Sequence, residues 1–63
     1  MAKFIQTENN YRIYELEHKE CQMFHREEPT FITWKYDEDI GNMLLSENES
    51  GTLEEMIKWC KEN

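Results

Sequence analysis

The chain has 63 residues and a formal charge of −7, because it contains seven Lys and Arg but fourteen Asp and Glu. A chain of this length is expected to form one domain, residues 1–63, that buries about 60% of its unfolded surface. The acidic balance argues against direct binding to nucleic acid or to an anionic membrane, since phosphates are neutralised by Lys and Arg. No apolar run approaches the ~20 residues of a membrane helix, and the first ten residues contain no apolar signal-peptide core.

The first two predicted elements are strands, Lys3–Glu8 and Tyr11–Glu17, joined at Asn9-Asn10. Asparagine tolerates the positive φ angles that a two-residue hairpin turn requires. Such a turn pairs Glu8 with Tyr11 and fixes the register of the whole hairpin. The sequence therefore predicts an antiparallel hairpin at the start of the chain.

The faces of this hairpin are harder to assign. The predicted register pairs Ile5 with Tyr14 and Lys3 with Leu16. One face then carries Ile5, Tyr14 and Leu16, and the other carries Phe4, Tyr11 and Ile13. Both sets are apolar, and a slip of one residue would exchange them. We expect the face with Tyr14 and Leu16 to be the inner one.

The segment Glu17–Glu28 is compatible with two conformations. Most of its residues are good helix formers and Pro29 is a natural stop, which predicts a short helix or an irregular turn. A helix would place Leu16, Met23 and Phe24 on one side. A strand is the alternative, because its residues also alternate in a period of two.

Thr30–Tyr36 is the strongest predicted strand, since it is rich in β-branched and aromatic residues. An acidic turn follows, then a fourth strand over Ile40–Leu45 and a polar loop over Ser46–Gly51. Side chains alternate along a strand. The set expected beneath the last helix is Ile32, Trp34 and Tyr36.

The last thirteen residues, Gly51–Asn63, predict an amphipathic helix. Thr52 is the expected N-cap, and Glu55 three residues later can complete a capping box by accepting from the Thr52 backbone N–H. One apolar stripe follows from positions i, i+3, i+4 and i+7, namely Leu53, Met56, Ile57 and Cys60. A helix of this length is marginal alone and must pack on another element.

These elements define the expected fold class. A sheet with one apolar face and a helix with one apolar stripe cover each other. We therefore expect an α+β fold with a three- or four-stranded antiparallel sheet, the C-terminal helix packed on one face, and a short helix between strands two and three.

One group of residues suggests metal binding. His18, Cys21 and His25 would share one side of a helix, and Cys60 would complete the donor set of a Cys2His2 zinc site. Against this, Cys60 lies on the apolar stripe that faces the core. The structural alternative is a buried thiol beside two surface histidines, and we expect no cofactor.

No catalytic set is recognisable, so the chain is predicted not to be an enzyme. We expect a small acidic interaction module, monomeric or homodimeric, whose protein partner has a basic surface. Its expected binding residues are an acidic patch and one aromatic anchor: Asp37, Glu38, Asp39, Glu47, Glu49 and Trp59. For Trp59, closing the edge of the core is the structural alternative.

Two further functional hypotheses remain open. One is a nucleic-acid mimic that inhibits a DNA- or RNA-binding protein, although the acidic residues are dispersed among lysines. The other is the zinc-stabilised module. Two cysteines are few for a secreted scaffold, which predicts a cytoplasmic protein with reduced thiols, while a Cys21–Cys60 bridge is the alternative. Size and acidity are typical of accessory proteins of phages or mobile elements.

Overall fold

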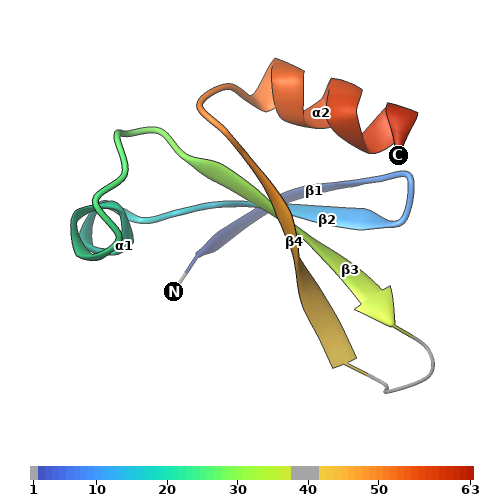
Figure 1. Cartoon of the computed structure of the whole chain (residues 1–63), viewed down its shortest axis with the longest axis horizontal. Coiled ribbons are helices and arrows are strands. Elements are labelled where there is room, and N and C mark those ends of the chain that lie inside the picture. Colours follow the sequence, from blue (N-terminus) through green and yellow to red (C-terminus); the bar gives the residue numbers. More distant parts are fainter. Residues whose placement is uncertain (1, 38–41) are drawn as a thin grey trace.

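A computed structural model describes the backbone of residues 2–37 and 42–63 and the side chains of residues 2–35 and 48–63. Within these described residues, four strands form one antiparallel sheet in the order β1-β2-β3-β4, and two helices complete the α+β fold predicted from the sequence (Figure 1). The elements are β1 (Lys3–Glu8), β2 (Tyr11–Glu15), α1 (His18–Met23), β3 (Phe31–Asp37), β4 (Asn42–Ser50) and α2 (Leu53–Glu62).

The last strand differs most from its predicted bounds. β4 extends to Ser50, so most of the segment expected to be a polar loop belongs to this strand. Glu49 pairs with Ile32 and Ser50 with Phe31, after a register shift that separates these pairs from the pair of Leu45 with Trp34. The beginning of the predicted strand, Ile40 and Gly41, lies outside the described residues. Neither helix in the described segments is long and apolar enough to cross a membrane.

The first hairpin confirms the predicted turn and corrects the predicted register. Asn9 and Asn10 have φ angles of 48° and 70°, and Glu8 pairs with Tyr11. A bulge then follows, because Gln6 pairs with Ile13 while Phe4 pairs with Tyr14. The predicted pairs of Ile5 with Tyr14 and of Lys3 with Leu16 were therefore wrong.

The bulge has a consequence for the core. An extra residue in one strand shifts every later side chain to the opposite face. Ile5 consequently packs in the cluster that contains Tyr11 and Ile13, and Phe4 lies on the face of Tyr14. The residue pattern of one strand could not reveal this, because the bulge is defined only by the pairing of two strands.

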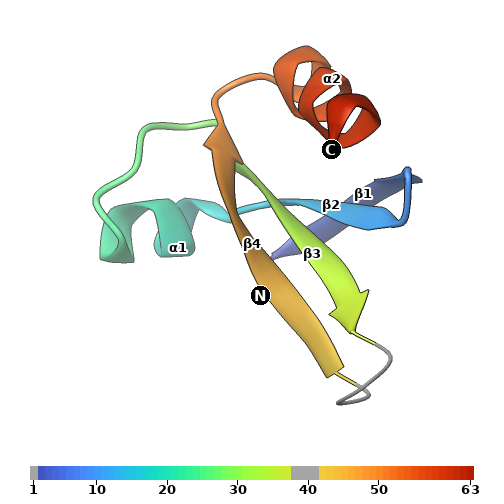
Figure 2. The ribbon, with the colours of Figure 1, turned by 45° about the vertical axis from the view of Figure 1, so that its right-hand side comes forward.

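Helix α2 covers one face of the sheet, as predicted, while α1 lies beyond one end of it (Figures 1 and 2). The covered face is not the predicted one. The buried cluster between α2 and the sheet consists of Tyr11, Ile13, Phe31, Met56 and Cys60. Of the residues expected there, Tyr14, Leu16, Ile32 and Trp34 belong to a second cluster on the opposite face, which also contains Cys21. The side chain of Tyr36, expected beside Trp34, lies outside the described residues.

Polar groups at its first turn fix the start of α2. Thr52 is the N-cap, and its Oγ1 accepts from the Glu55 N–H at 3.2 Å. The predicted bond from the Thr52 N–H to the Glu55 carboxylate is replaced by two bonds through Ser50. Ser50 Oγ accepts from the Thr52 N–H at 3.2 Å and donates to Glu55 Oε2 at 2.9 Å. The Ser50 hydroxyl thus satisfies the donor that Glu55 was expected to reach.

The predicted apolar stripe of α2 is confirmed. Met56 and Cys60 are fully buried, and Leu53 and Ile57 pack against the same cluster. At the other end of the helix, Asn9 Nδ2 donates to the Cys60 carbonyl at 2.8 Å. This bond satisfies one of the carbonyls that a helix end leaves open, and it ties the first hairpin turn to the last helix.

The short helix α1 confirms the predicted helix between strands two and three, but its orientation differs. Glu20 Oε1 accepts from the Glu17 N–H at 3.0 Å, which stabilises the first turn. Cys21 is the buried residue of the helix, whereas Met23 and Phe24, expected beside Leu16 on the inner side, are 69% and 52% exposed. A helix of six residues can turn only one narrow side inward, and here the small thiol occupies it.

A left-handed residue ends α1. His25 has φ 56°, the Arg26 N–H donates to the Cys21 carbonyl at 2.8 Å, and the His25 N–H donates to the Gln22 carbonyl at 3.4 Å. These two bonds form a Schellman motif, in which glycine is usual at the position of His25. The motif reverses the chain and leads it back toward β3.

Candidate functional site

The four residues of the hypothetical zinc site are not brought together. Cys21 and Cys60 are both free, and each is buried in a different cluster on an opposite face of the sheet. His18 is exposed with its Nδ1 2.6 Å from Glu28 Oε2, and His25 occupies the helix-ending position. Among the described side chains, those of residues 2–35 and 48–63, no group of three or more potential ligands lies close enough to hold a metal ion. The predicted donor set is therefore not one that this fold assembles.

Burial also determines the protonation of Cys60. Loss of water around the thiol raises its pKa, and the nearby Glu8 carboxylate raises it further. A protonated thiol is a poor nucleophile and a poor metal ligand, because both functions need the thiolate. Cys60 is consequently a core residue by its environment as well as by its position.

The predicted acidic patch is described only in part. Glu38 and Asp39 lie outside the described residues, as do the side chains of Asp37 at the end of β3 and Glu47 within β4. Glu49 is exposed and accepts from Arg26, with Nε at 2.7 Å and Nη2 at 3.4 Å. This carboxylate is thus engaged within the chain.

The predicted aromatic anchor, Trp59, closes the edge of the core. Its ring packs edge-to-face on Tyr11 with 5.1 Å between centroids, and the Lys35 ammonium lies 5.3 Å from the centre of the same tyrosine ring. Trp59 is half-buried in this arrangement. The geometry is that of the structural alternative, while a role in partner binding stays a prediction.

The face of the sheet opposite α2 carries a feature that the sequence did not reveal. Phe4 packs edge-to-face on Tyr14 at 5.7 Å, and Tyr14 packs on Trp34 at 6.4 Å. These three side chains, here called the aromatic row, cross strands β1, β2 and β3. Phe4 is 52% exposed, and Tyr14 and Trp34 are half-buried. Without the bulge, Phe4 and Tyr14 would be assigned to opposite faces, which is why strand periodicity missed the row.

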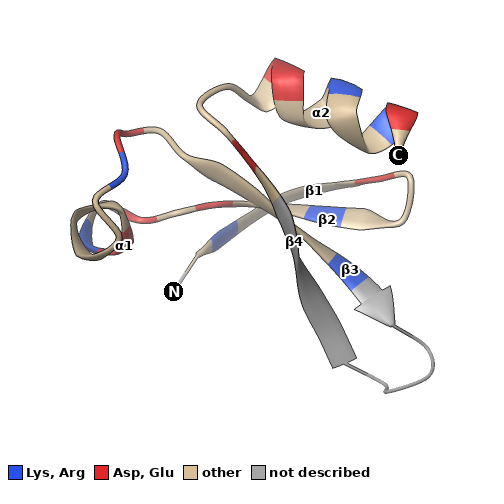
Figure 3. Cartoon of the chain, viewed as in Figure 1, with Lys and Arg blue, Asp and Glu red and all other residues tan. Residues whose placement is uncertain are grey.

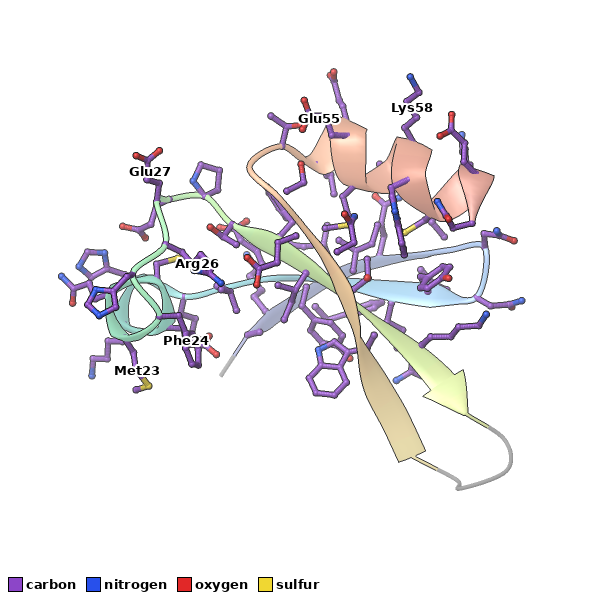
Figure 4. The ribbon with its side chains drawn as sticks, viewed as in Figure 1. Met23, Phe24, Arg26, Glu27, Glu55 and Lys58 are labelled. Carbon is purple, nitrogen blue, oxygen red and sulfur yellow. The ribbon has the colours of Figure 1, made fainter. Side chains whose placement is uncertain are left out.

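A small apolar pocket lies on the same face. Its volume is about 190 Å³, and its lining consists of Leu16, Phe24, Ile32, Arg26 and Glu49. Arg26 extends from the α1–β3 segment toward the sheet, whereas Met23 points away from it (Figure 4). The pocket therefore combines three apolar side chains with an ion pair whose charges already satisfy each other.

A second, more polar hollow of about 360 Å³ shares the Arg26–Glu49 pair with the apolar pocket. Its lining comes from residues 26–30 and 49–51, which include Glu27, Glu28 and Thr30. The three carboxylates around one guanidinium give this hollow an acidic character. It provides no cluster of ligands for a metal ion in the described part of the chain.

Acidic residues outnumber basic ones along the segment that contains α1 and leads to β3, which supplies Phe24 and Arg26 to the apolar pocket (Figure 3). Residues 17–28 together with Glu49 contain five acidic and two basic side chains, a balance of −3 with both histidines neutral. A negative border around an apolar surface attracts basic molecules and repels acidic ones.

Comparisons with protein-family models, with curated protein sequences and with solved structures gave no match to this chain.

Proposed function

We propose that this chain is a non-enzymatic interaction module that binds a basic segment of another protein with the aromatic row. The observation that carries the proposal is a connected set of aromatic rings on the sheet face that α2 leaves uncovered. Tyr, Trp and Phe contribute strongly to protein interfaces because they bury a large area with few rotatable bonds. Aromatic faces also attract the cationic groups of Lys and Arg.

The charge of the chain supports a basic partner. A net charge of −7 on 63 residues creates an attractive field for a cationic segment and speeds its association. The same charge disfavours a second copy as the occupant, since two chains would bring −14 together. We place the module in the cytoplasm, where reduced thiols such as the free Cys21 and Cys60 persist, and regard an accessory role in a phage or mobile element as compatible with its size.

Selection from a random displayed peptide library on the immobilised chain tests this function. We expect enriched peptides to combine Lys or Arg with apolar residues and to lose most of their binding to the Phe4→Ala variant. Phe4 is half exposed, so its removal leaves the buried clusters intact. Lys58→Ala is the matched control, because Lys58 is exposed on α2, away from the aromatic row (Figure 4).

Ionic strength separates this function from nucleic-acid mimicry. Contacts made by exposed charges weaken as salt screens them, whereas burial of aromatic surface persists. Enriched peptides should therefore stay bound at high salt. Peptides that are released at high salt, and whose affinity is the same for the Phe4→Ala variant, would contradict the proposal and favour a surface that acts by charge alone.

A further inference from the structure

We infer that the apolar pocket is the specificity pocket of this module and receives one aliphatic side chain of leucine size from the same basic partner segment. The inference rests on the proposed function and deepens it, because it names which residue the partner must carry between its basic side chains. The argument depends on the size of the pocket, the chemistry of its walls and the charge of its border.

The size of the pocket selects a single side chain. Its volume of about 190 Å³ is below the ~300 Å³ at which pockets for small-molecule ligands begin. The pocket is too small for a cofactor or a nucleotide. One aliphatic side chain delivered by an extended segment fits this scale.

The walls select an apolar group. Leu16 and Ile32 form part of the buried cluster on this face, and Phe24 provides an exposed aromatic wall. The two polar members, Arg26 and Glu49, bond to each other at 2.7 Å and therefore offer little to a polar ligand. An aliphatic side chain would lose water in this pocket without leaving a hydrogen-bonding group unsatisfied.

The border selects the residues that flank the aliphatic one. The adjoining polar hollow, in which Glu27, Glu28 and Glu49 outnumber the single charge of Arg26, complements Lys or Arg on either side of it. It also opposes occupation by a second copy of this acidic chain. The occupant that satisfies both the walls and the border is a basic segment with a central aliphatic residue.

Two short peptides test the inference by nuclear magnetic resonance titration of the labelled full chain. The probes are Lys-Lys-Leu-Lys-Lys and Lys-Lys-Ala-Lys-Lys, each added to millimolar concentration. We expect the leucine peptide to shift the amide signals of Leu16, Phe24 and Ile32 and to bind about 5- to 10-fold more tightly than the alanine peptide, the discrimination that a small apolar pocket supplies.

Variants of two neighbouring residues provide the matched comparison. Phe24→Ala should bring the affinity ratio of the two peptides to about one without changing the affinity for the alanine peptide, because it removes one wall of the pocket. Met23→Ala should preserve the ratio, since Met23 is exposed and does not line the pocket. Both side chains are at least half exposed, so both variants should remain folded.

The outcomes distinguish this inference from the function on which it rests. Equal affinities of the two peptides, with shifts confined to Phe4, Tyr14 and Trp34, would contradict binding of an aliphatic side chain in the pocket and leave the aromatic row as a binding surface. A preference for leucine that survives Phe24→Ala would also contradict binding in the pocket. Absence of any shift with either peptide would contradict both proposals, and concentration-dependent shifts of the pocket residues without peptide would identify a second copy as the occupant.

Discussion

The two faces of the sheet are similarly apolar, but they are buried to different extents. Helix α2 covers the face with Tyr11, Ile13 and Phe31, and Ile13 of the sheet and Met56 and Cys60 of the helix are fully buried between the two. Near one end of the opposite face lies the short α1, whose buried residue is Cys21. Aromatic side chains therefore remain partly exposed there. The difference shows that one ten-residue helix can bury one face of a small sheet and leave aromatic side chains partly exposed on the other.

The largest expected difference in stability is between variants of two methionines. Met56 lies in the buried cluster between α2 and the sheet, and Met23 lies exposed on α1. Met56→Ala removes a fully buried side chain that also accepts from Asn48 Nδ2 at 3.3 Å. We expect a loss of about 2–5 kcal/mol in the free energy of unfolding. That loss is comparable to the ~3–5 kcal/mol that a core of this size rarely exceeds. Met23→Ala should change it by less than about 0.5 kcal/mol.

Urea unfolding followed by far-ultraviolet circular dichroism measures both methionine variants. A similar loss in the two would show that Met23 is covered in solution and would remove the distinction between the faces.

The next effect concerns the helix that covers one face. Thr52→Ala deletes the hydroxyl that accepts from the Glu55 N–H and should cost about 1 kcal/mol. Thr52→Ser retains the hydroxyl and should recover most of that stability. The same unfolding measurement applies, and a Thr52→Ser variant as unstable as Thr52→Ala would exclude capping as the reason.

A smaller effect is expected for the ion pair beside the apolar pocket. The side chains of Arg26 and Glu49 are 46% and 42% exposed, so solvent and salt weaken their attraction. Arg26→Gln should lower the free energy of unfolding by less than about 1 kcal/mol, and by less still at high salt. A double-mutant cycle with Glu49→Gln isolates the pair, and a coupling that salt leaves unchanged would contradict the expected screening.

The smallest expected effect is a dependence of stability on alkaline pH. The pKa of Cys60 is raised in the folded state, so the folded chain holds the thiol proton at pH values where the unfolded chain has released it. Stability from this group is complete below the unfolded pKa and is lost as pH rises through the folded pKa. Unfolding curves from neutral to alkaline pH should show this decline.

Cys60→Ala provides the control for the pH dependence, since it removes the thiol whose pKa is raised. Its stability should fall less steeply over the same alkaline range. An equally steep fall in the variant would assign the decline to other groups.

Local residue patterns determined the parts of this fold that depend on neighbours in the chain. The Asn9-Asn10 turn, the Thr52 cap and the stripe of Met56 and Cys60 follow from conformational preference and from a helical period of 3.6. These features predicted the α+β class and the helix that packs on the sheet. The helix formers of Glu17–Glu28 and the stop at Pro29 predicted the short helix after the first hairpin, but the side expected to face inward was wrong, since Cys21 is buried and Met23 and Phe24 are exposed.

Tertiary structure alone decided which sheet face α2 covers and therefore where the candidate binding surface lies. Both faces of the hairpin are apolar, so a period of two could not rank them. The bulge between Phe4 and Gln6 then moved Ile5 toward α2 and Phe4 toward Tyr14. The physical reason is that a bulge belongs to the pairing of two strands, and the pairing forms only when residues distant in the chain come together.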